Sequence, residues 1–168
     1  TGEQPSLVGV DGCGAPLAAI SLSGLGRAYA SLGAAARNIR AEARMATVAT
    51  AMLDYPEFVE GPGRSNTVIM EQLDVIAKLG AEGVLGLGTT DGYSVAVKTL
   101  DGSGRINALV GLNLLIAVGA IDPERARPVT VRPRSGPIGP RTGMGARIVT
   151  TTTATPSTLY TLLAFRSS

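Results

Sequence analysis

The apolar residues of this chain recur at helical spacing in four stretches and alternate as in β-strands in three others. Helices are predicted over residues 16–33, 35–53, 65–80 and 105–118. Strands are predicted over residues 6–10, 83–87 and 93–100. An Asp91-Gly92 dipeptide lies between the last two strands and is typical of a hairpin turn. These elements together predict an α+β fold.

Two of the helices have features that the structure can test. Pro16 suits the first turn of the first helix, and Gly24 weakens that helix while permitting close packing. In the third helix Ile76 belongs to the inward stripe. Asp74 and Lys78 lie four residues apart on its outer face, a spacing that favours an ion pair along a helix.

The chain changes character after residue 122. Residues 1–122 hold eight basic and twelve acidic side chains, whereas residues 123–168 hold seven arginines and one glutamate. The second stretch is rich in Arg, Pro and Gly, and it has no apolar period. We therefore predict a domain over 1–122 and an irregular tail over 123–168. The acidic charge of the domain argues against a nucleic-acid groove, which needs clustered cations.

Composition excludes several kinds of site. The sequence has no histidine, which rules out Ser-His-Asp and Cys-His catalysis and histidine metal ligands. A single cysteine excludes an internal disulfide and a four-cysteine zinc site, and it favours the cytoplasm as the compartment. The longest apolar run covers residues 108–121, fewer than the roughly 20 needed to cross a bilayer, so no membrane partner is expected.

Asp11 and Cys13 lie two residues apart in a glycine-rich turn between the first predicted strand and helix. In extended backbone they would share one face, and the start of a helix favours a thiolate or a bound anion. Cys13 is therefore a candidate soft metal ligand, and Asp11 is a candidate acceptor for an ammonium or hydroxyl group. The alternative is an inert thiol that follows a turn-forming aspartate.

Lys98 is one of two lysines and lies in an otherwise apolar strand. A lysine inside a half-buried strand must find a partner or lose its proton. Both outcomes suit a site where an amine polarises a hydroxyl group or takes its proton. The alternative is an edge-strand lysine that prevents aggregation.

Four ordered segments together carry a family resemblance. They are Val10-Asp11-Gly12-Cys13-Gly14-Ala15-Pro16 and residues 56–64, 80–84 and 95–102, the last of which contains Val95-Ala96-Val97-Lys98. In this order and at these gaps they resemble the Rhizobium-type L-asparaginases of the asparaginase II family, over about residues 7–120.

The resemblance implies an enzyme that hydrolyses L-asparagine, a small-molecule amide, to L-aspartate and ammonia. It implies a fold similar to serine β-lactamases and glutaminases, with a mixed sheet backed by helices, and a homodimer. Such enzymes use serine nucleophiles activated by lysines, near a zinc ion held by two cysteines and a lysine. Cys13 matches the second of those cysteines, Asp11 an acidic residue near the substrate, and Lys98 the lysine of the second serine–lysine pair.

The chain departs from the family's pattern in what it lacks. The serine nucleophiles, the Ser-x-x-Lys motif and the first zinc-binding cysteine and lysine have no counterpart in these residues. We therefore expect a chain truncated at its N-terminus that corresponds to the C-terminal half of the family, with little or no amidase activity alone. The alternative is a non-catalytic domain or subunit fragment that associates with another chain through the surface left uncovered.

Overall fold

The computed structural model describes residues 1–127, 129, 144–149 and 162–167. The elements in this part of the chain follow the order β1 (Leu7–Val10), β2 (Pro16–Ala19), α1 (Leu22–Ala35), α2 (Ala43–Asp54), α3 (Glu57–Glu60), α4 (Ser65–Leu73), β3 (Val75–Gly80), β4 (Val84–Thr89), β5 (Ser94–Lys98), α5 (Asn107–Ala117), α6 (Pro123–Ala126), β6 (Met144–Val149) and β7 (Leu162–Ser167). The fold is α+β, as the sequence predicts.

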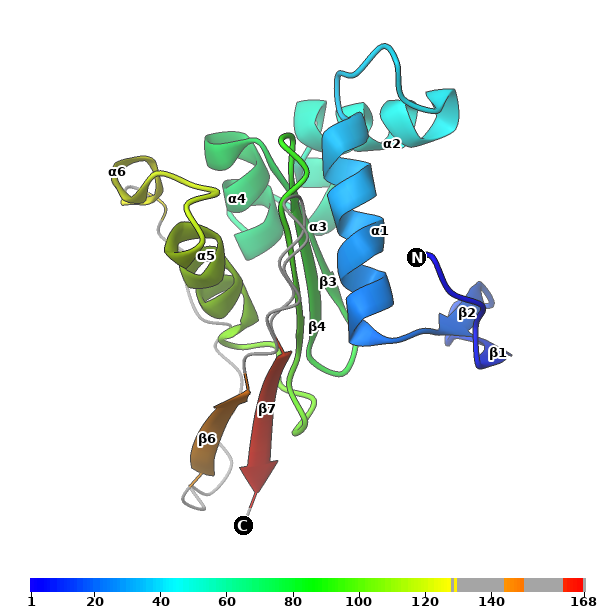
Figure 1. Ribbon diagram of the computed structural model, residues 1–168, viewed down its shortest axis with the longest axis vertical. Coiled ribbons are helices and arrows are strands. Elements are labelled where there is room, and N and C mark those ends of the chain that lie inside the picture. The colour runs from blue at the N-terminus through cyan, green and yellow to red at the C-terminus, as the bar shows by residue number, and fades with distance from the viewer. Residues whose placement is uncertain (128, 130–143, 150–161, 168) are drawn as a thin grey trace.

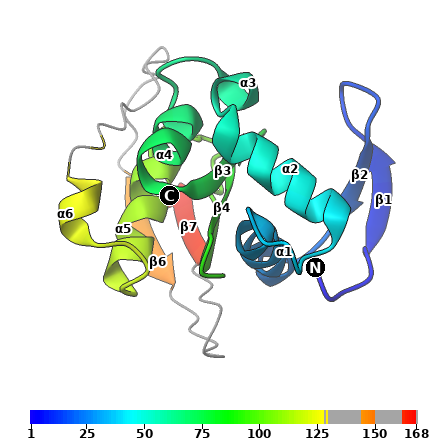
Figure 2. The same ribbon diagram turned by 90° about the horizontal axis from the view of Figure 1, so that it is seen from above.

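A three-stranded antiparallel sheet in the order β3-β4-β5 forms the centre of the molecule. Figures 1 and 2 show α1 and α2 on one side of this sheet and α4 and α5 on the other. Residues of β4 that face α5, among them Leu85 and Leu87, are fully buried. Burial of apolar side chains between these layers supplies the main stabilising free energy of the fold.

The helix α1 lies unusually close to β4 because both elements carry glycine at the crossing. A methyl group on Gly88 would lie 2.1 Å from the Tyr29 carbonyl oxygen, and one on Gly33 would lie 2.4 Å from the Thr89 carbonyl oxygen. The Tyr29 ring covers Gly86. Burial raises the pKa of the Tyr29 hydroxyl above its ordinary value.

The predicted helix at Pro16 is wrong in its first turn. Residues Pro16–Ala19 form β2 and pair antiparallel with β1, from Leu7 opposite Ala19 to Val10 opposite Pro16. The helix begins at Leu22, where the Ser21 hydroxyl accepts a hydrogen bond from the Gly24 N–H. The turn at residues 11–15 brings the neighbouring strand β1 into register with residues 16–19, and this pairing outweighs the local preference of Pro16.

The third predicted helix is also too long. It ends at Leu73, because Asp74 adopts a left-handed conformation with φ of 54°. Ile76 and Lys78 lie in β3, so Lys78 forms no helical pair with Asp74. Asp74 instead pairs with Arg37 at 3.2 Å. The second predicted helix begins at Ala43 rather than at residue 35.

Two strands lie in the stretch for which the sequence predicts no regular structure. β6 and β7 pair antiparallel, and β7 lies close to β5. Every strand pair in the described residues is antiparallel, whereas the resemblance implies a mixed sheet. Among those residues, no helix combines the length and apolarity that a membrane span requires.

Candidate functional site

A groove of about 570 Å³ runs between the β1–β2 hairpin, the first turn of α1 and the end of the central sheet. Its walls are mainly apolar and include Leu7 and Leu17 of the hairpin, Leu25 of α1 and Val84 of β4. Lys98, at the end of β5, is the charged residue among those that line it. A ligand in this groove would therefore meet one ammonium group against an apolar wall.

The turn between β3 and β4 provides a partner for Lys98. The Lys98 Nζ donates a hydrogen bond to the backbone carbonyl of Glu82. Glu82 and Gly83 have φ of 56° and 68°, and these consecutive left-handed residues direct the backbone of the turn. The sequence predicts that Lys98 either finds a partner or loses its proton, and the Glu82 carbonyl is a hydrogen-bond partner. β5 is also an edge strand of the three-stranded sheet, which is the position that the alternative reading of Lys98 requires.

A buried polar cluster fixes this turn to the segment that follows Lys98. The Gly83 carbonyl accepts hydrogen bonds from the Thr99 backbone N–H at 3.0 Å and from Asn107 Nδ2 at 2.7 Å. The Thr99 hydroxyl donates to the Ser103 carbonyl at 2.6 Å. Thr99 and Asn107 are almost fully buried, so the backbone that follows Lys98 is held firmly against the β3–β4 turn. Neither residue has a spacing in the sequence that indicates such a role, so neither is predicted from it.

Asp11 is the residue that closes the hairpin turn. Its Oδ1 accepts hydrogen bonds from the backbone N–H groups of Cys13 at 2.9 Å and Ala15 at 3.1 Å. The Cys13 side chain, followed by these backbone donors, lowers the pKa of the Asp11 carboxyl below its ordinary value. Asp11 is therefore ionised at neutral pH. Asp11 therefore forms the turn, as the alternative to a ligand-binding role states. Its second carboxylate oxygen, Oδ2, takes part in neither backbone hydrogen bond.

Cys13 lies exposed in the same turn. In the described residues, no three His, Cys, Asp or Glu side chains come together as metal ligands. Because the sequence contains no second cysteine, the residues of this chain do not form the zinc site that the resemblance implies. No chemical step is therefore assigned to a metal.

The hairpin is the element that relates these three residues to one another. Asp11 and Cys13 lie together at its turn, while Lys98 lies in the groove that its strands line. The hairpin points away from the central sheet in Figure 2. All eight residues of its strands are exposed, and Val10 and Leu17 are 70% and 56% exposed. The structure thus groups Asp11 and Cys13 at the hairpin turn, and neither of them lines the groove that contains Lys98.

Comparison with known proteins gives a match to a sequence family. A sequence model of the L-asparaginase II family matches residues 1–143, which include Asp11, Cys13 and Lys98. The match extends past residue 122, where the sequence predicts the end of the domain. No protein among those with curated descriptions matches the chain.

Proposed function

Because the chain belongs to the L-asparaginase II family, we propose that it supplies part of an amidohydrolase site that converts L-asparagine to L-aspartate and ammonia. The observation that carries the proposal is the family match across residues 1–143, with Lys98 placed in a groove. Membership of the family supports a small-molecule substrate with a carboxamide group. The preference for asparagine over other amides is part of the proposal.

Lys98 is assigned the role of base toward a hydroxyl nucleophile. An uncharged amine can donate one N–H to the Glu82 carbonyl while its lone pair accepts the hydroxyl proton. The hydroxyl oxygen then attacks the amide carbon, and the protonated Lys98 passes the same proton to the amide nitrogen. The C–N bond breaks as ammonia leaves, and water hydrolyses the acyl-enzyme to release aspartate. The described contacts support a Lys98 that is held in one orientation for this transfer.

Asp11 is assigned to the substrate. Its lowered pKa keeps the carboxylate charged at neutral pH, and Oδ2 is the oxygen that accepts neither backbone N–H of the turn. A charged carboxylate oxygen is a suitable acceptor for the α-ammonium group of an amino-acid substrate.

Several finer statements belong to the same proposal. We propose that the chain is of the Rhizobium type, that it corresponds to the C-terminal half of a serine β-lactamase-like fold, and that it acts in the cytoplasm as part of a homodimer. Cys13 would contribute one ligand to a zinc ion whose other ligands are not among these 168 residues. The chain alone is expected to release little or no ammonia from asparagine, since the sequence contains no Ser-x-x-Lys motif.

A second candidate function rests on the exposure of the hairpin. Leu7, Val8 and Val10 are each at least 66% exposed, and apolar strands in such a position favour association with another chain. Under this alternative the chain is a non-catalytic domain that binds a partner. It predicts association without binding of asparagine.

Lysine-selective isotope labelling tests the asparaginase proposal, because the sequence contains only Lys78 and Lys98. Addition of L-asparagine is expected to shift the NMR signal of Lys98 saturably and to leave that of Lys78 in place. Asp11→Asn should weaken the binding of L-asparagine measured by calorimetry, because Asp11 is the residue assigned to the substrate, whereas Lys78→Ala, the control, should retain it. Equal shifts of both lysines, or no shift at saturation, would contradict the proposal.

A further inference from the structure

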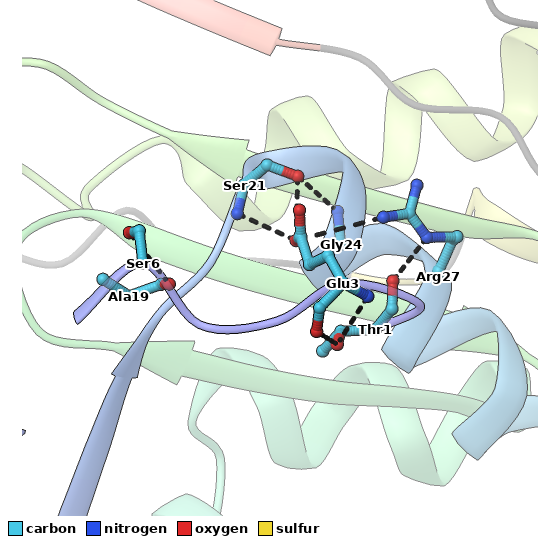
Figure 3. Close-up of polar contacts among 7 residues, drawn as sticks. All are labelled: Thr1, Glu3, Ser6, Ala19, Ser21, Gly24 and Arg27. Carbon is cyan, nitrogen blue, oxygen red and sulfur yellow. Dashed lines mark hydrogen bonds and ion pairs between the residues drawn. The ribbon is translucent and has the colours of Figure 1, made fainter. Parts of the chain in front are cut away.

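The segment before the hairpin is fastened to the start of α1 by a carboxylate. Glu3 Oε1 accepts hydrogen bonds from the Ser21 backbone N–H and from the Ser21 hydroxyl, both at 2.9 Å (Figure 3). Arg27 Nη2 lies 3.9 Å from the same oxygen. Glu3 therefore contacts three polar groups, two of Ser21 and one of Arg27, although it lies 18 residues before Ser21.

A glycine in the helix makes room for this carboxylate. A methyl group on Gly24 would lie 1.6 Å from Glu3 Oε1, so any larger residue would displace the Glu3 side chain. The sequence suggests that Gly24 weakens the helix, and the structure gives a reason for its presence. The Ser21 hydroxyl accepts from the Gly24 N–H at 2.9 Å while it donates to Glu3, so helix cap and carboxylate form one connected group (Figure 3).

Two further contacts extend the attachment along the segment. Arg27 Nε donates to the Thr1 carbonyl at 2.5 Å, and the Ser6 N–H donates to the Ala19 carbonyl at 3.0 Å (Figure 3). The hairpin is thus tied to α1 at both of its ends. The chain runs from β2 through Ser21 into α1. On the other side, Glu3 precedes β1 and binds Ser21.

The exposed position of the hairpin strands makes this attachment important. Because all the residues of β1 and β2 are exposed, packing holds the hairpin only weakly against the body. We propose that Glu3 is a positioning residue, which latches residues 1–6 onto α1 and so sets the place of the turn containing Asp11 and Cys13 relative to Lys98. This inference rests on the proposed function insofar as those three residues serve one site.

Spin labelling tests the latch without substrate. Cys13 is the only cysteine and is exposed, so it accepts one label, and Glu71→Cys on the exposed face of α4 accepts the second. Electron–electron distance measurements on the full chain are expected to show one narrow distance distribution. Glu3→Ala should broaden this distribution about twofold or more, because the hairpin loses its hold on α1.

Three further variants separate positioning from a general effect on folding. Gly24→Ala keeps the Glu3 charge but displaces the carboxylate, and it should broaden the distribution as Glu3→Ala does. Glu3→Gln keeps an acceptor oxygen for Ser21, and it should restore the narrow distribution. Glu57→Ala on α3 removes an exposed carboxylate elsewhere and should leave the distribution narrow.

The outcomes decide the proposal independently of catalysis. A narrow distribution in both Glu3→Ala and Gly24→Ala, a broad one in the unaltered sequence, or equal broadening by Glu57→Ala would each overturn the latch. Because the measurement contains no asparagine, the latch can stand while the amidohydrolase assignment fails, and the reverse also holds.

Discussion

At the scale of single residues, the packing of α1 on the sheet depends on the absence of side chains. Gly86 and Gly88 of β4 leave a track in which Tyr29 lies, and a methyl group on Gly86 would come within 2.2 Å of the Tyr29 ring. Tightly packed interiors transmit such a clash into side-chain and backbone shifts. The glycines of β4 thus fix how near α1 comes to this strand, which begins at Val84 beside the groove.

Gly86→Ala is therefore expected to lower the free energy of unfolding by about 1–3 kcal/mol, since the Tyr29 ring must move. In a Tyr29→Ala background, Gly86→Ala should lower the free energy of unfolding by less than it does in the unaltered sequence. A double-mutant cycle with urea denaturation measures the difference. Gly9→Ala is the matched control, because no atom lies within 4 Å of the added methyl group. Additive effects of Gly86→Ala and Tyr29→Ala would contradict this account of the packing.

At the scale of elements, left-handed residues decide where helices and turns end. Asp74 ends α4 with φ of 54°, and Glu82 directs the β3–β4 turn with φ of 56°. Such conformations cost about 1–2 kcal/mol for residues other than glycine. The glutamate side chain is not needed for the contact with Lys98, because the acceptor is the Glu82 backbone carbonyl.

We accordingly expect Glu82→Gly to raise the free energy of unfolding by about 0.5–1 kcal/mol, as glycine adopts this conformation without strain. The comparison is Glu71→Gly, an exposed helical glutamate whose replacement should cost about 1 kcal/mol. Urea denaturation of the two variants measures both values. A loss of stability in Glu82→Gly equal to that in Glu71→Gly would show that the turn gains nothing from glycine.

Local sequence signals predict some elements better than others. The antiparallel strands β4 and β5 and the helix α5 follow from alternation, the Asp91-Gly92 turn and helical spacing. β2 does not, because its strand character comes from pairing with β1 rather than from Pro16 and its neighbours. The apolar spacing does not separate β3 from α4, because Ile76 continues the helical pattern across the point where Asp74 turns the chain.

At the scale of the whole molecule, the candidate site also has parts that local sequence signals indicate and parts that they do not. Asp11, Cys13 and Lys98 are candidates that the sequence alone offers, because an acid, a thiol and an amine stand out among apolar and glycine residues. The Glu82 carbonyl is not such a candidate, since a backbone acceptor has no residue identity. The separation of the hairpin turn from Lys98 depends on Glu3, Ser21 and the start of α1, and no local pattern indicates it.

The central claim is that the hairpin turn and the Lys98 groove belong to one site, and a thiol-to-amine cross-link between them tests it most directly. The sequence has one cysteine and two lysines, so a short heterobifunctional reagent on Cys13 has few acceptors, and peptide mass spectrometry identifies the one reached. The account predicts a cross-link from Cys13 to Lys98, formed in lower yield in the Glu3→Ala variant. Attachment of Cys13 to Lys78 alone, or to neither lysine, would contradict it.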